Sequence, residues 1–156
     1  MSQENSGQTN LEQQLDNVLN EYNSNNKISD IYSSDVSSYL NMPRDQIEAL
    51  SKEDRFTAAI QLSQYTIYLQ RLINRERARL SWCNAIINSV GAAHWEEHSD
   101  FLKFEIKIAK LAREHTTIER AMKIRNHAQI RIDELDGVAQ LIKHLSDMIM
   151  RSTYVS

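Results

Sequence analysis

Residues 56–90 form a long amphipathic pattern that contains no Gly or Pro and predicts a single helix. With about 100° of rotation per residue, its apolar side chains gather on one face of that helix. This face consists of Leu62, Tyr65, Leu69, Leu72, Ile73, Leu80, Cys83, Ile87 and Val90. Ser51 with Asp54 resembles a capping box at the start of this helix, and Gly91 marks its expected end. An apolar face of this length requires a packing partner.

A second apolar pattern begins at Phe101 and changes register partway along the chain. Its first part recurs at spacings of three and four and consists of Phe101, Phe104, Ile108, Leu111, Ile118 and Met122. Its second part consists of Ala128, Ile132, Leu135, Val138, Ile142, Leu145 and Ile149. We expect Ser99 or Asp100 to cap this helix. The helix then either tolerates a stutter in the 120s or breaks there and resumes, and Gly137 is either a kink or a tolerated residue.

The N-terminal part of the chain is polar and predicts little stable structure. Residues 1–10 and 23–38 are rich in Asn, Ser and Gln, which favours disorder. Between them, residues 11–22 carry apolar side chains on one side of a short helix that is too short to be stable alone in water. Pro43 is expected in the first turn of another short helix. We therefore predict an acidic, mostly disordered leader over residues 1–42 and a helical oligomerisation and nucleic-acid-binding domain over residues 43–156.

The composition favours an all-α fold. Three Gly and one Pro in 156 residues leave few sites for tight turns. A short connection at residues 91–99 predicts long antiparallel helices, and thin apolar cores of this kind favour an oligomeric bundle or ring. A single Cys, Cys83, excludes an intramolecular disulfide framework and is expected to be a buried small apolar residue. Because no signal peptide or membrane span is apparent, we expect a cytoplasmic protein with no membrane partner.

Charge is distributed unevenly along the chain, whose net charge is −3. Residues 1–55 hold 10 acidic and 4 basic side chains, whereas residues 56–156 hold 11 acidic and 14 basic ones. An acidic leader before a basic helical body indicates either a separate basic partner or competition for the cationic face.

Basic and aromatic side chains form a line beside the apolar face of the first long helix. The line consists of Gln64, Tyr68, Arg71, Arg75, Arg79 and Trp82. Arginines neutralise phosphates and aromatic rings stack on unpaired bases, so this line predicts binding of single-stranded nucleic acid. A solvated face or a set of interhelical ion pairs explains the same spacing and remains open. Glu76 lies within the apolar face, so we expect an Arg or Lys of another helix or subunit to pair with it.

The second long helix carries its own basic line. Its members are Lys103, Lys107, Lys110, Arg113, Arg120, His127 and Arg131, and Thr117 fills the gap between Arg113 and Arg120. If the two long helices pack through their apolar faces, the two basic lines border one cationic surface.

Candidate catalytic chemistry is limited to one motif. His94, Glu97 and His98 match the H-x-x-E-H pattern of inverted zinc peptidases. The motif lies where the first long helix is expected to end, without a third-ligand motif, so we interpret it as a polar loop. His115 lies in the apolar register and is interpreted as a core or interface residue. No phosphate-binding loop or nucleophile elbow occurs in the sequence, so we expect no enzymatic activity, no cofactor and no metal.

Three segments resemble the UvsY family of bacteriophage recombination mediators. They are the block QYTIYLQRLINRERARLSW at residues 64–82, the long basic helix after a polar loop, and the ending LIKHLSDM at residues 141–148. The resemblance covers residues 56–151, and the leader is longer than in that family. It implies a helical, ring-forming accessory protein that binds single-stranded DNA, contacts a recombinase and a single-strand binding protein, and helps to load the recombinase. The family's basic residues correspond here to Arg71, Arg75, Arg77 and Arg79.

The sequence therefore predicts an oligomeric recombination mediator that holds single-stranded DNA on basic helical faces. The alternative is a structural or assembly protein, such as a scaffold or virion component, that uses the same apolar stripes without binding nucleic acid.

Overall fold

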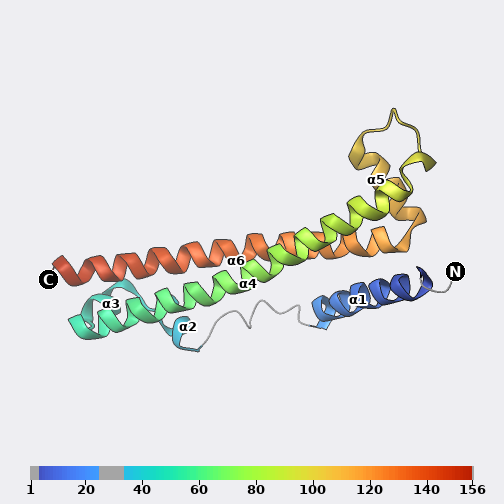
Figure 1. The fold of residues 1–156 in the computed structure, drawn as a ribbon. Helices are drawn as coiled ribbons and strands as arrows, with labels where there is room; N and C mark the ends of the chain where they lie inside the picture. The colour runs from blue at the N-terminus through green and yellow to red at the C-terminus, as the bar shows by residue number, and fades with distance from the viewer. Residues whose placement is uncertain (1–3, 25–33, 156) are drawn as a thin grey trace. The chain divides into compact units, whose positions relative to one another are not determined.

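The chain is all-α in a computed structural model that describes residues 4–24 and 34–155 (Figure 1). These residues contain no strand. The elements are α1 (Glu4–Ser24), α2 (Ser34–Leu40), α3 (Arg44–Ala49), α4 (Lys52–Ala93), the 3-10 turn η2 (Trp95–Glu97), α5 (Phe104–Glu114) and α6 (Thr116–Val155). The two long helices, α4 and α6, pack against each other. None of the described helices combines the length and apolar character needed to cross a bilayer.

Helix α4 begins where the sequence predicts. The backbone N–H of Asp54 donates to Ser51 Oγ at 3.0 Å, which confirms the expected cap. The helix ends at Ala93, two residues past Gly91 and near the expected position. A Cβ at Gly91 would lie 3.1 Å from Ile108 Cδ1, so the glycine allows α5 to approach α4 closely.

The chain divides into two compact units, each with its own buried core. Unit 1 comprises Met1–Asn26 and Glu76–Ile130, and unit 2 comprises Lys27–Arg75 and Arg131–Ser156. The core of unit 1 is built from α1, α4, α5 and α6 and contains Leu15, Tyr22, Cys83, Ile86, Ile87, Ile108, Leu111, Ala112, Ile118, Ala121 and Ile124.

Helix α1 differs from the expectation of a mostly disordered leader. It begins at Glu4, so residues 4–10 are helical, and α2 makes residues 34–38 helical as well. The predicted apolar side of residues 11–22 is confirmed, because Leu15 and Tyr22 are buried in the core of unit 1. Burial against the rest of the chain supplies the stability that a short isolated helix lacks. Residues 25–33, also expected to be disordered, lie outside the described part of the chain.

Unit 2 is held together by apolar packing and by polar contacts between α4 and α6. Arg55 Nη1 donates to the carbonyl of Ser152 at 2.9 Å, and Ser146 Oγ donates to the carbonyl of Ala59 at 2.9 Å. The buried apolar residues here are Val36, Ala58, Ala59, Leu62, Leu69, Ile73, Ile132, Leu135, Ala139, Ile142 and Ile149. Both predicted apolar registers, those of the first helix and of residues 128–149, are thus found in the interior.

The second predicted helix breaks earlier than expected. The interruption is at His115, whose φ of −122° and ψ of 109° are extended, and α6 then runs unbroken through the 120s. Gly137 is tolerated within α6. The expected cap at Ser99 or Asp100 is wrong: α5 begins at Phe104, and Phe101 is 99% exposed in the preceding turn.

Candidate nucleic-acid interface

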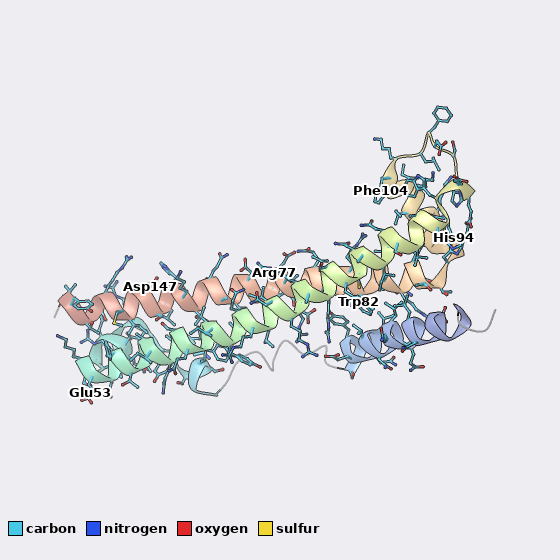
Figure 2. The ribbon with its side chains drawn as sticks, in the orientation of Figure 1. Glu53, Arg77, Trp82, His94, Phe104 and Asp147 are labelled. Atoms are coloured by element: carbon cyan, nitrogen blue, oxygen red, sulfur yellow. The ribbon has the colours of Figure 1, made fainter. Side chains whose placement is uncertain are left out.

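Arg79 and Trp82, two members of the predicted basic and aromatic line, lie inside unit 1. Arg79 Nη2 donates to Glu21 Oε2 at 2.6 Å, and Arg79 Nη1 lies 3.4 Å from Glu76 Oε1. The guanidinium also lies 5.1 Å from the ring centroid of Tyr22. Trp82 packs against the core that contains Tyr22, on the α1 side of α4 (Figure 2). Both side chains therefore hold α1 in place, and we leave them out of the proposed interface.

The contacts around Arg79 shift the pKa values of Arg79 and Tyr22. Burial opposes the charge of Arg79, but hydrogen bonding to Glu21, the contact with Tyr22 and, to a smaller extent, the field of Glu76 outweigh it and raise the pKa of the guanidinium. Tyr22 Oη donates a very short hydrogen bond to Glu76 Oε2. Burial and this bond to Glu76 raise the pKa of Tyr22 to about 12. The expectation that an Arg or Lys of another helix or subunit pairs with Glu76 is wrong: its basic partner is Arg79 of the same helix, and the contact from another helix comes from Tyr22.

Gln64, Tyr68, Arg71 and Arg75 form the exposed part of the line, and all four belong to unit 2. They follow one another at spacings of three and four on α4, so they share one face of that helix. Tyr68 is 47% exposed, and its ring centroid lies 5.5 Å from that of Tyr65 at a tilt of 39°. Arg71 and Arg75 are also exposed. This face offers an accessible aromatic ring beside two exposed arginines, of which Arg75 also interacts with another group of the chain.

Helix α5 in unit 1 and the residue before it carry a second set of exposed basic side chains. Lys103, at its start, is exposed together with Lys110 and Arg113. Lys107 is instead 1% exposed, with Nζ 4.2 Å from the centroid of the Trp95 ring and 3.5 Å from Asp100 Oδ1. Within the described residues its Nζ has no hydrogen-bond partner. Burial removes Lys107 from any direct contact with nucleic acid.

The remaining members of the second line lie on α6 and do not continue the row on α5. The break at His115 separates the two helices. Arg120 Nε lies 3.2 Å from Asp16 Oδ1 of α1, so this arginine also helps to hold α1. His127 stacks on Tyr22 with centroids 5.1 Å apart. Arg131 is partly exposed and already interacts with other groups of the chain.

The H-x-x-E-H motif contributes two of its three residues to a compact cluster. His94 Nδ1 lies 2.6 Å from Glu97 Oε1, and His115 Nε2 lies 3.0 Å from Glu97 Oε2. The two imidazoles stack with centroids 3.8 Å apart. Hydrogen bonds from His115 and His94 lower the pKa of Glu97. His98 instead contacts Glu114 at 3.1 Å and does not belong to this cluster.

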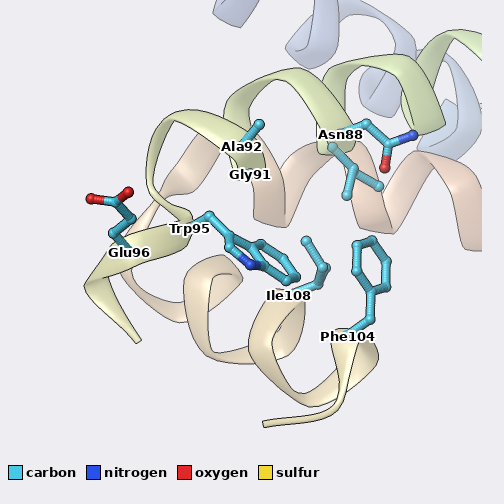
Figure 3. A pocket seen from close by; sticks show the side chains of 8 residues that line it. Asn88, Gly91, Ala92, Trp95, Glu96, Phe104 and Ile108 are labelled. Atoms are coloured by element: carbon cyan, nitrogen blue, oxygen red, sulfur yellow. The ribbon is translucent and has the colours of Figure 1, made fainter. Parts of the chain in front are cut away.

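A pocket of about 460 Å³ lies between the end of α4 and α5 in unit 1. Figure 3 shows the side chains of Trp95, Ile108 and Phe104 along it, with Glu96 pointing away. The rings of Trp95 and Phe104 are 5.3 Å apart. Such a lining is apolar, with Asn88 and Glu96 as its polar members, and lacks the converging polar groups of a typical ligand site.

Cys83 is fully buried in the core of unit 1. Burial raises the pKa of its thiol to about 11, against smaller opposite effects of Arg125 and Arg79. A thiol of this kind is protonated near neutral pH and is a poor nucleophile. The interpretation of Cys83 as a small apolar core residue is consistent with this environment.

Comparisons of the chain with protein-family models, curated proteins and solved structures found no match.

Proposed function

We propose that this chain binds single-stranded DNA as a homo-oligomer and helps to load a recombinase in phage recombination and repair, without enzymatic activity. The observation that carries the proposal is the exposed face of α4 formed by Tyr68, Arg71 and Arg75. Guanidinium groups bind phosphates in a salt-dependent way, and an accessible ring stacks on bases of any sequence. The recombinase and single-strand binding protein enter the proposal as partners through the family resemblance of residues 56–151.

Helix α5 supplies a second contribution through Lys103, Lys110 and Arg113. Each exposed group is small, so a single chain is expected to bind weakly. Several copies linked in one oligomer raise the apparent affinity through effective concentration, without any new contact. Multivalency therefore makes self-association part of the proposed mechanism.

Exposed apolar residues of unit 2 support self-association. On α4 these include Ile60 and Ile67, and on α6 they include Leu141 and Met148. The proposed oligomer is a bundle or ring of long antiparallel helices, in keeping with the contacts of Arg55 with Ser152 and of Ser63 with Ser146. Apolar side chains at these positions lose contact with water when copies associate.

A charge introduced among these exposed apolar residues should disrupt the oligomer. Leu141 is 70% exposed, so Leu141→Glu should leave the fold of a single chain intact and lower the molar mass measured by light scattering. His144→Glu is the matched control, because it places the same side chain at an exposed polar position of α6. Equal molar masses for the wild type and Leu141→Glu would contradict this role of the surface.

Fluorescence anisotropy with a labelled oligothymidylate tests DNA binding. The logarithm of the association constant should fall with the logarithm of salt concentration at a slope of about −0.7 for each phosphate neutralised. Duplex DNA of the same length should bind more weakly, because its bases are not available for stacking on Tyr68. An oligouridylate in the same assay separates DNA from RNA preference.

The alternative, a structural or assembly protein, is favoured by the exposed apolar residues alone. It predicts oligomers with no salt-sensitive binding to the oligothymidylate. That result would overturn the proposed function.

A further inference from the structure

We propose that His94, Glu97 and His115 form a binding site for a divalent transition-metal ion, with Zn²⁺ as the best match. Their imidazole nitrogens and carboxylate oxygen all lie within 4.8 Å of one another. The proposal concerns unit 1 alone and does not depend on DNA binding. Its role is structural: the ion would join the end of α4 to the junction of α5 and α6.

The spacing of the donor atoms is close to that of a tetrahedral zinc site. With Zn–N and Zn–O bonds of about 2.0–2.2 Å, neighbouring ligand atoms lie about 3.3 Å apart. His94 Nδ1 and His115 Nε2 lie 2.6 and 3.0 Å from the two oxygens of Glu97. To admit the ion, the donor atoms would have to separate to this distance, and the stacked rings of His94 and His115 would have to part so that both nitrogens face it.

The backbone fixes the positions of all three residues. His94 is the N-cap of the 3-10 turn η2 and Glu97 is its last residue, and in such a turn residues three apart lie one above the other. The N–H of Glu97 donates to the carbonyl of His94 at 3.1 Å. His115 is held from both sides, because its N–H donates to Leu111 at 2.8 Å and its carbonyl accepts from Glu119 at 3.1 Å. The break between α5 and α6 thus brings a distant histidine to the turn.

The donor set selects the type of ion. Two imidazoles and one carboxylate suit Zn²⁺ and its first-row neighbours, whereas Ca²⁺ and Mg²⁺ prefer oxygen ligands. The three side chains are partly exposed, at 36% for His94, 44% for Glu97 and 23% for His115, which leaves room for water as a fourth ligand. His98 is held by Glu114 instead and stands outside the donor set.

Titration of the tag-free full-length chain with Zn²⁺, against a chromophoric zinc chelator, tests the site. We expect one ion per chain. His115→Ala should weaken Zn²⁺ binding by about a hundredfold, because even the loss of a group that only supports a metal ligand lowers metal affinity by about 10- to 100-fold. His98→Ala is the matched control and should bind like the wild type. Co²⁺ should bind to the same site and give the visible absorption of a tetrahedral complex.

A second variant keeps the test independent of folding. Glu97→Gln retains a side chain of the same size that still hydrogen-bonds to the histidines, but it is a poor zinc ligand, and it should also lose tight binding. Far-UV circular dichroism of each variant establishes that the helices are intact. The proposal fails if the wild type binds no stoichiometric Zn²⁺. In that case the three side chains interact only with one another. It also fails if His98→Ala loses as much affinity as His115→Ala.

Discussion

Replacing Glu76 with alanine should lower the free energy of unfolding by about 3 kcal/mol. Glu76 is almost fully buried, where it accepts the hydrogen bond of Tyr22 and faces Arg79 at 3.4 Å. Its removal leaves the buried phenol without its acceptor and the guanidinium, which is only 14% exposed, with Glu21 as its remaining carboxylate partner. Because Tyr22 belongs to α1, this change should also loosen the docking of α1.

Urea denaturation followed by circular dichroism measures this effect. Glu134→Ala removes an exposed carboxylate of α6 and should change the free energy of unfolding by less than about 0.5 kcal/mol. Tyr22→Phe combined with Glu76→Ala completes a double-mutant cycle, and a positive coupling energy is expected because the two side chains are in contact. If Glu76→Ala were as stable as Glu134→Ala, the described network would not contribute to the fold.

The sequence indicated that Glu76 needs a partner, but the expectation of a basic residue from another helix or subunit was wrong. A carboxylate within an apolar helical face needs a partner, and the partner basic residue lies three positions away as Arg79. The same pattern could not show that Arg79 forms ion pairs with Glu21 and Glu76 and is therefore not available to bind a phosphate. Its spacing with Arg71 and Arg75 is compatible equally with an exposed line and with ion pairs, and only the docking of α1 decides between them.

The N-terminal helix shows the limit of local reasoning in another way. Residues 4–10 contain little apolar surface, so composition favours disorder. The helix extends through them because Leu15 and Tyr22 are fixed in the core of unit 1, and a helix nucleated there adds residues at low cost. Helicity of this segment depends on contacts that lie far away in the sequence.

The position of the break between α5 and α6 also could not be predicted from the spacing of the apolar residues. The register changes between Met122 and Ala128, yet the backbone departs from helix at His115. There the side chain of His115 reaches Glu97, 18 residues earlier. Lys107 is a similar case, since its basic character predicts exposure but the ring of Trp95 covers it. Pairings of this kind across a turn cannot be read from helical spacing.

Removing the guanidinium groups of Arg71 and Arg75 should weaken binding to single-stranded DNA by about tenfold at physiological salt for each chain that contacts the strand. Each lost phosphate contact should also reduce the salt slope by about 0.7. Both side chains are exposed, but Arg75 also interacts with another group of the chain, so urea denaturation of the double variant must accompany the binding measurement. Arg79→Ala should have the opposite profile, with a large loss of stability because Glu21 and the buried Glu76 lose their guanidinium partner.

The most direct test of the account is the salt-dependent anisotropy of a labelled oligothymidylate, measured for the double variant Arg71→Ala/Arg75→Ala beside Lys143→Ala/Arg151→Ala. The control removes the same charge from exposed positions of α6. The account predicts a slope reduced by about 1.4 for each chain of the α4 variant that contacts the strand, together with the weaker binding, and wild-type behaviour for the control. Equal affinities and slopes for the two double variants would contradict a DNA-binding face on α4.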